Sequence, residues 1–136
     1  MSQETDRRFL IIGDPTSGEL VGVDVSSGQP AWRTPLGRGD FDFAISGPYI
    51  VVVSVLGSAV HCIDYTSGRV LWKAETTAKH SHPQIVIDGP RVFVARFGHV
   101  DCFGGDGTRY WTYKLHGAPK SIAFGFPGNV RPTDHS

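Results

Sequence analysis

The stretch that decides the fold of this chain runs from His61 to Trp72 and reads HCIDYTSGRVLW. Two other stretches repeat its pattern: VGVDVSSGQPAW at residues 21–32 and DCFGGDGTRYW at residues 101–111. In each stretch a tryptophan follows a glycine by four residues, and the three tryptophans lie 40 and 39 residues apart. An internal repeat of this length is typical of propellers and solenoids.

Short runs of β-branched and aromatic residues surround this stretch, and turns that contain glycine or proline separate the runs. In the middle unit the turns fall at residues 47–48, 57–58 and 66–68. They divide the unit into four expected strands, at residues 41–46, 49–56, 59–65 and 69–75. This alternation predicts a four-stranded antiparallel meander, which is one propeller blade.

The flanking units carry the same pattern, but one blade is divided between the two ends of the chain. Residues 83–115 predict a complete four-stranded unit, whereas the first unit, residues 9–34, lacks its first strand. A lone strand is expected at residues 120–126. The prediction is an all-β single domain over residues 1–136 with three blades, approximately 41–75, 83–115, and 9–34 together with 120–126.

The composition is that of a globular protein without a charge bias. Of the 136 residues, 40% are hydrophobic and 19% are charged, and Lys+Arg and Asp+Glu number 13 each. This balance argues against nucleic acid and anionic membrane surfaces as partners. The polar start of the chain is unlike a signal peptide, and no apolar run has the length of a membrane span, so we expect a cytoplasmic protein.

The two cysteines are expected to remain free thiols. When the repeats are aligned on Asp64 and Phe103, Cys62 and Cys102 fall one residue apart. Side chains alternate between the two faces of a strand, so this register predicts that the thiols point to opposite faces. The lack of an expected disulfide fits a reducing compartment.

The unit Asp-x-x-Ser-Gly-x-x-x-Trp resembles the repeat of the pyrroloquinoline-quinone-type (PQQ-like) β-propellers. Residues 24–32 and 64–72 match it closely, while the third copy has Phe103 in place of the aspartate. The resemblance implies that the tryptophans pack between neighbouring blades. It does not imply a quinone cofactor, because quinoprotein dehydrogenases use an adjacent cysteine pair and a calcium site, and the chain shows neither pattern. Many proteins with this repeat act as scaffolds in protein assembly or as sensor domains.

The repeat also assigns structural roles. An aspartate before a turn commonly accepts hydrogen bonds from the turn backbone, and a glycine in the turn can adopt a positive φ. A tryptophan on the last strand of a blade buries a large area against the next sheet. The predicted structural residues are Trp32, Trp72, Trp111, Gly28, Gly68, Gly107, Asp24 and Asp64.

Three blades do not close a ring, because propellers typically have about four to eight blades. Open sheet edges invite pairing with another chain, and exposed apolar faces mark interfaces. We therefore expect a homodimer that forms a six-bladed propeller, in which residues 120–126 of one copy complete the first blade of the other. The alternative is that the chain is a fragment of a longer propeller.

Polar residues on the loops that follow the fourth strands are the candidate ligand-binding residues, because in PQQ-like propellers these loops usually meet the ligand. His80 and His82 could lie on one side of an extended segment, and neutral imidazole binds zinc, copper or nickel. No third ligand is evident apart from the repeat position of His116, so no metal site is predicted. The candidates are Arg38, Asp40, His80, His82, His116 and Lys120.

The sequence favours a non-enzymatic scaffold or binding module that recognises a protein or a small ligand through one face of the ring. It contains no nucleophile elbow and no phosphate-binding glycine loop, and no catalytic residue or cofactor is assigned. His99 and Asp101 share one face of a strand and Cys102 takes the other, which argues against a thiolate site. The expected partner is a second copy, with another protein as an alternative. A carbohydrate- or metabolite-binding propeller, and an enzyme that uses the histidine-rich loops, remain alternative functions.

Overall fold

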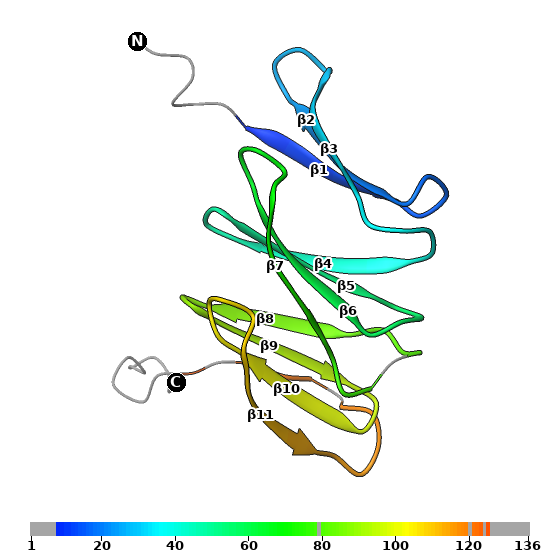
Figure 1. The fold of residues 1–136 in the computed structure, drawn as a ribbon, viewed down its shortest axis with the longest axis vertical. Coiled ribbons are helices and arrows are strands. Elements are labelled where there is room, and N and C mark those ends of the chain that lie inside the picture. Colours follow the sequence, from blue (N-terminus) through cyan, green and yellow to red (C-terminus); the bar gives the residue numbers. More distant parts are fainter. Residues whose placement is uncertain (1–7, 79, 120, 124, 126–136) are drawn as a thin grey trace, which may run out of the picture.

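Three antiparallel sheets follow one another along the long axis of the molecule (Figure 1). The computed structural model describes residues 8–78, 80–119, 121–123 and 125. Every element assigned in this part of the chain is a strand, and it holds no helix that could cross a membrane. The three sheets confirm the predicted all-β architecture.

Each sheet is a meander in which consecutive strands pair, and we call the sheets the first, second and third blade. The first blade has three strands: β1 (Phe9–Asp14), β2 (Glu19–Asp24) and β3 (Pro30–Pro35). The second has four: β4 (Phe41–Ser46), β5 (Tyr49–Ser54), β6 (Ala59–Asp64) and β7 (Val70–Glu75). The third also has four: β8 (Gln84–Asp88), β9 (Arg91–Arg96), β10 (His99–Phe103) and β11 (Arg109–Lys114).

The turn before each tryptophan strand is held by an aspartate in all three blades. Asp64 accepts hydrogen bonds from the Thr66 N–H and the Ser67 hydroxyl, at 3.1 and 2.9 Å. Asp24 accepts one from Ser26 N–H at 2.8 Å in the first blade. In the third blade Asp106, which lies inside the turn, accepts one from Thr108 N–H at 3.0 Å. These bonds satisfy backbone donors that a tight turn leaves without a ladder partner.

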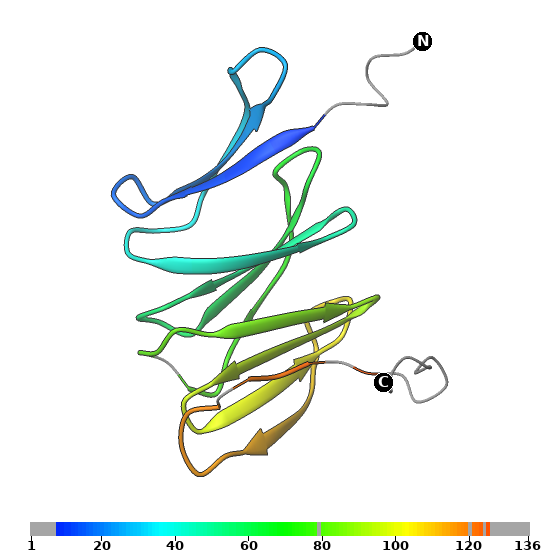
Figure 2. The same cartoon turned by 180° about the vertical axis from the view of Figure 1, so that it is seen from behind.

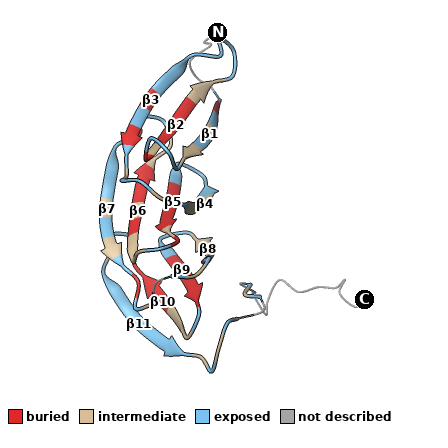
Figure 3. Cartoon of the chain, turned by 90° about the vertical axis from the view of Figure 1, so that its right-hand side faces the viewer, coloured by how far each residue is buried: buried red, intermediate tan, exposed pale blue. Residues whose placement is uncertain are grey.

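Apolar side chains fill the two junctions between blades. At the first junction Leu20 and Trp32 pack against Ile50, Val52 and Ile63 of the second blade. At the second junction the opposite face of the second blade packs against the third, through Val51, Val53, Val60, Cys62, Val92, Val94 and Phe103. Burial is therefore concentrated in β2, β5, β6, β9 and β10, which lie inside their sheets and not at the outer edges, as Figure 3 shows.

Strand pairing corrects the sequence register of the two cysteines. Cys62 lies opposite Trp72 and Cys102 lies opposite Trp111, so the two thiols occupy the same repeat position and not opposite faces. The cause is a shorter turn in the third blade. Its closing hydrogen bond joins residues 104 and 108, whereas the second blade joins residues 64 and 69. Gly104 therefore takes the place of the aspartate that the sequence assigned to Phe103. Both thiols are buried and free.

The structure describes only part of the segment 120–126, and that part does not form the expected strand. Residues 121–123 and 125 belong to no strand, and Lys120, Phe124 and Phe126 lie outside the described residues. The described segment instead runs across the outer face of the third blade (Figure 2), where Ile122 and Ala123 line a cavity of about 170 Å³ with Val86, Phe93 and Val100. A strand needs a partner edge, and the open edge of β1 lies at the other end of the stack.

Candidate functional site

Trp32 forms the contact that joins the first two blades. Its ring packs over Gly68, where a Cβ atom would come within 2.5 Å of the ring carbons. The indole N–H donates to the Tyr65 carbonyl at 3.0 Å, and the Thr34 hydroxyl donates to the Gly68 carbonyl at 2.5 Å. Gly68 is required both for this space and for its φ of 75°.

Trp72 makes the corresponding contact at the second junction. Its ring packs over Gly107, where a Cβ atom would come within 2.8 Å. The ring also packs on Phe103, with the ring centroids 6.1 Å apart. At both junctions the tryptophan of one blade thus lies over the turn glycine of the blade that follows it in the sequence.

Trp111 has no following blade. Ile122 and Ala123 lie beside Phe93 and Val100 on this side of the third blade, whereas Trp111 itself stays exposed. Its fractional exposure is 45%, compared with 9% for Trp32, and the neighbouring Tyr113 is also exposed. The ring contact of Trp111 is with Phe93 of its own sheet, at a centroid distance of 6.1 Å. The packing between blades that the family resemblance implied for all three tryptophans is therefore seen for Trp32 and Trp72 but not for Trp111. We call Phe93, Val100, Trp111 and Tyr113 the leading face.

The outer side of the first blade is a second surface with exposed apolar side chains. Pairing places Leu10 and Ile12 at the positions of Ile50 and Val52 in the second blade. Leu10 and Ile12 are 57% and 41% exposed, whereas Ile50 and Val52 are 0% and 2% exposed. Gly28 has the same φ of 75° as Gly68, but nothing lies within 4 Å of its Cβ position. We call Leu10, Ile12, Val23, Val25 and Gly28 the trailing face.

Arg96 is a buried cation that the sequence did not single out. Its guanidinium donates to the carbonyls of Val55, Gly57 and Ser81 at 2.5–2.8 Å. Burial lowers the pKa of Arg96, while the carboxylates of Asp101 and Asp42 act in the opposite direction. Arg96 thus fastens the β5–β6 turn to the segment that connects the second and third blades.

Asp101 is the second buried charge of this connection. Its carboxylate accepts hydrogen bonds from Thr77 N–H at 2.8 Å, from the Thr77 hydroxyl at 2.7 Å and from the Thr112 hydroxyl at 2.6 Å. Arg109 lies 3.8 Å away and completes an ion pair. Neither Asp101 nor Arg96 follows a recognisable motif, because each stands in a short strand whose pattern indicates packing alone.

The structure does not bring the predicted loop residues into one site. Arg38 and Asp40 line a cavity of only about 30 Å³. His82 lies 3.1 Å from the Asp42 carboxylate, with both side chains open to solvent. His80 and His116 are exposed, and Lys120 lies outside the described residues. No three His, Cys, Asp or Glu side chains within the described ranges form a group that could hold a metal ion.

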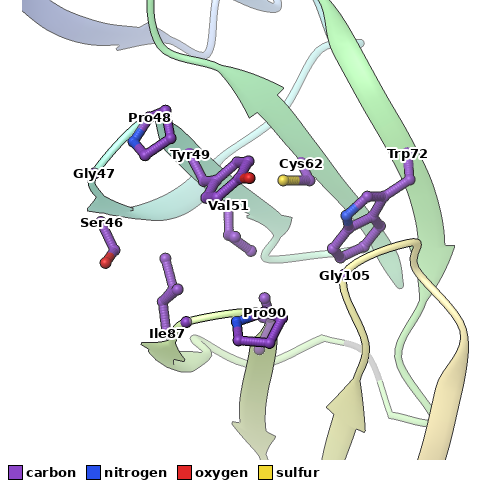
Figure 4. Close-up of a pocket in the computed structure, with 12 residues that line it drawn as sticks. Ser46, Gly47, Pro48, Tyr49, Val51, Cys62, Trp72, Ile87, Pro90 and Gly105 are labelled. Atoms are coloured by element: carbon purple, nitrogen blue, oxygen red, sulfur yellow. The ribbon is translucent and has the colours of Figure 1, made fainter.

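A larger cavity lies between the second and third blades, at the end of the sheets opposite these loops (Figure 4). It measures about 300 Å³ and is walled mainly by apolar and aromatic groups. The thiol of Cys62 faces it, and burial raises the pKa of this thiol to about 11. The cavity lining is Ser46, Gly47, Pro48, Tyr49, Val51, Cys62, Trp72, Ile87, Gly89, Pro90, Val92 and Gly105.

Residues 56–124, about half of the chain, match a family model described as outer membrane protein assembly factor BamB. The chain belongs to this BamB family of PQQ-like propellers. A curated BamB from Burkholderia pseudomallei is 27% identical over 108 residues, which cover 78% of this chain and 28% of that protein. The chain thus spans less than a third of the length of the BamB relative that it matches.

Solved structures show the same fold at lower identity. BamB from Moraxella catarrhalis matches with a TM-score of 0.62 and 21% identity, over 79% of this chain and 34% of that one. The computationally designed Ika4 protein matches with a TM-score of 0.71 and 12% identity, over 88% of this chain and 75% of that one. Hydrazine synthase from Kuenenia stuttgartiensis gives 0.60 and 16%, over 79% and 34%. BamB-family blades therefore share their architecture with proteins of unrelated names, and fold alone assigns no activity.

Proposed function

We propose that the chain is a non-enzymatic protein-interaction module that binds further propeller blades through its leading and trailing faces. One observation carries the proposal: Leu10 and Ile12 are exposed, whereas the same positions in the second blade are buried under a neighbouring sheet. Exposed apolar faces of this kind mark interaction surfaces. A second copy is the partner whose surface fits, because the leading face repeats the surface that covers Ile50 and Val52 inside the chain.

The contact in such a pair follows from the two junctions within the chain. By repeat position, Trp111 of one copy would lie over Gly28 of the other, as Trp32 lies over Gly68. Its indole N–H would donate to the Val25 carbonyl, which corresponds to the Tyr65 carbonyl. Two contacts of this kind, related by a two-fold axis, would close a ring of six blades without leaving an open face.

The edge of β1 offers a further contact for the same partner. Phe9 turns both its N–H and its C=O away from β2, toward the Tyr65 hydroxyl, at 2.7 and 3.1 Å. In an antiparallel pair alternate residues point the same way, so Ile11 and Gly13 also direct their backbone groups outward. We propose that residues 120–126 of the partner pair along this edge and supply the strand that the first blade lacks.

The mass of the chain in solution tests the pairing. Analytical ultracentrifugation at micromolar concentration should give twice the 14.8 kDa mass of one chain. Trp111→Ser and Leu10→Lys should each weaken self-association by roughly tenfold or more, because each removes one side of the junction. Leu71→Ser is the matched control, because Leu71 is an exposed apolar residue of the second blade that belongs to neither face. A monomeric wild type, or equal self-association of Trp111→Ser, would contradict the proposal.

Another protein is the alternative partner for the same faces. The curated relative is named as an outer membrane protein assembly factor, and that name supports a protein as the partner. A cytoplasmic location of this chain remains a proposal, and cell fractionation with a tagged full-length protein tests it.

A further inference from the structure

The cavity between the second and third blades has a counterpart at the first junction that is filled. There the ring of Tyr65 packs against Phe9, with the ring centroids 5.4 Å apart. The Tyr65 hydroxyl is hydrogen-bonded to the backbone of Phe9. An aromatic ring thus occupies the space between the start of β1 and the turn of the next blade.

At the second junction the same position carries no side chain. Tyr49 corresponds to Phe9, because each pairs with the last residue of the third strand of its blade, Asp64 and Asp24. Gly104 corresponds to Asp64 by the hydrogen bond that closes the turn, so the residue that follows, Gly105, stands in the place of Tyr65. Tyr49 is accordingly 41% exposed, and both Tyr49 and Gly105 line the cavity.

We propose that this cavity binds a small neutral aromatic molecule, whose ring takes the place that Tyr65 occupies at the first junction. The site does not depend on the proposed pairing of two chains, because every residue that lines it belongs to one copy.

The lining suits a planar ring without a charge. No Asp, Glu, Lys, Arg or His side chain is among the lining residues. The rings of Tyr49 and Trp72 and the flat faces of Pro48 and Pro90 offer packing surfaces, and aromatic pairs gain from edge-to-face or offset contact. Ionic ligands would enter this site without a partner charge, which is unfavourable.

The size of the cavity also fits one or two rings. A cavity of ~150 Å³ is enough to hold benzene in a protein core, and ligand pockets begin at roughly 300 Å³. The cavity here, at about 300 Å³, lies at the lower end of that range. The indole N–H of Trp72 has no hydrogen-bond partner among the described residues, unlike that of Trp32, so a phenol oxygen could accept from it.

Titration with p-cresol, which is the tyrosine side chain as a free molecule, tests the site. We expect saturable one-to-one binding that shifts the amide NMR signals of Gly105 and Gly89 and the indole signal of Trp72. A saturated ring of the same substitution, 4-methylcyclohexanol, should bind at least about tenfold more weakly. Equal binding of the two molecules, or no saturable binding of p-cresol, would overturn the proposal.

Two variants at Gly105 locate the ligand. Gly105→Tyr should fill the cavity from within and weaken p-cresol binding by about tenfold or more. The backbone accepts this change, since Gly105 has no positive φ and its Cβ position makes only ordinary contacts of 3.5–4.0 Å with Pro90. Gly105→Ala is the matched control, because it removes the glycine but leaves the cavity open, and it should bind p-cresol like the wild type. Unchanged binding in Gly105→Tyr would place the ligand elsewhere and refute the site.

The reverse change at the first junction gives an independent readout. Tyr65→Ala should open a second ring-sized space beside Phe9, so that p-cresol raises the thermal midpoint of this variant more than that of the wild type. An equal shift in both proteins would contradict the equivalence of the two positions on which the proposal rests.

Discussion

At the scale of single residues, Gly28 and Gly68 share a left-handed backbone but differ in their contact with a tryptophan ring. Both have a φ of 75° and both follow a Ser-Ser or Thr-Ser pair in the same turn. Only Gly68 is covered by a tryptophan ring, that of Trp32, which packs against its Cα. The cost of a left-handed backbone and the cost of a lost ring contact can therefore be measured apart.

Gly28→Ala and Gly68→Ala, made in the Trp111→Ser background so that no partner covers Gly28, should differ in stability. Gly28→Ala should lower the free energy of unfolding by about 1–2 kcal/mol, the cost of a Cβ at positive φ. Gly68→Ala should lose a further ~1–3 kcal/mol, because its Cβ displaces the Trp32 ring. Urea unfolding measures both, and equal losses would show that the ring can move without cost.

The thiol of Cys62 predicts a dependence of stability on pH. Burial raises its pKa from 9.0 to about 11, so the unfolded chain loses this proton at lower pH than the native chain does. The thiol's contribution to stability is therefore complete below pH 9.0 and falls as the pH rises to about 11. The difference in unfolding free energy between the wild type and Cys62→Ala should shrink over this interval. A difference that stays constant through it would mean that the thiol ionises equally in both states.

At the scale of strands and connections, Arg96 links the β5–β6 turn to the segment between the second and third blades. Arg96→Met should lower the free energy of unfolding by about 3 kcal/mol, because the carbonyls of Val55, Gly57 and Ser81 lose a buried charged donor. Arg33→Met is the matched control. Arg33 forms an exposed ion pair with Glu19 at 3.2 Å, and the loss of that pair should cost less than about 1 kcal/mol. Similar losses for the two variants in chemical denaturation would show that the buried contacts contribute no more than the exposed one.

The strands themselves were predictable, because β-branched runs and glycine turns alternate with the period of a meander. The packing of Trp32 and Trp72 between blades followed from the family resemblance, but their contacts with Gly68 and Gly107 did not. The register of the third blade did not, since the turn at residues 104–108 is one residue shorter and the sequence gives no sign of where the missing residue falls. That one residue also reversed the prediction for Cys102.

The site was less predictable than the fold, for a physical reason. The histidines at residues 80, 82 and 116 stand out in the sequence because imidazole can bind metals. A metal site needs three such side chains close together, and no group of this kind forms among the described residues. The cavity arises from what is absent at Gly105, and a missing side chain leaves no motif. Its position is marked only by the difference between the two junctions, with Tyr65 at the first and Gly105 at the second.

At the scale of the whole molecule, the proposed pairing through the leading and trailing faces would make stability depend on protein concentration. Association that favours the native state raises the thermal midpoint as the protein concentration increases. The midpoint of the wild type should therefore rise with concentration, whereas that of Trp111→Ser should rise less over the same range. Differential scanning fluorimetry over a dilution series measures this, and a constant midpoint for both proteins would argue that the faces remain uncovered in solution.

Since Trp32 and Trp72 each lie over the glycine of the blade that comes next in the sequence, the stack of blades has a direction. Trp111→Ser alters the leading face and Leu10→Lys alters the trailing face, so neither variant should associate with a second copy of itself. A mixture of the two variants still contains one intact leading face and one intact trailing face, which is enough for an open heterodimer but not for a closed ring.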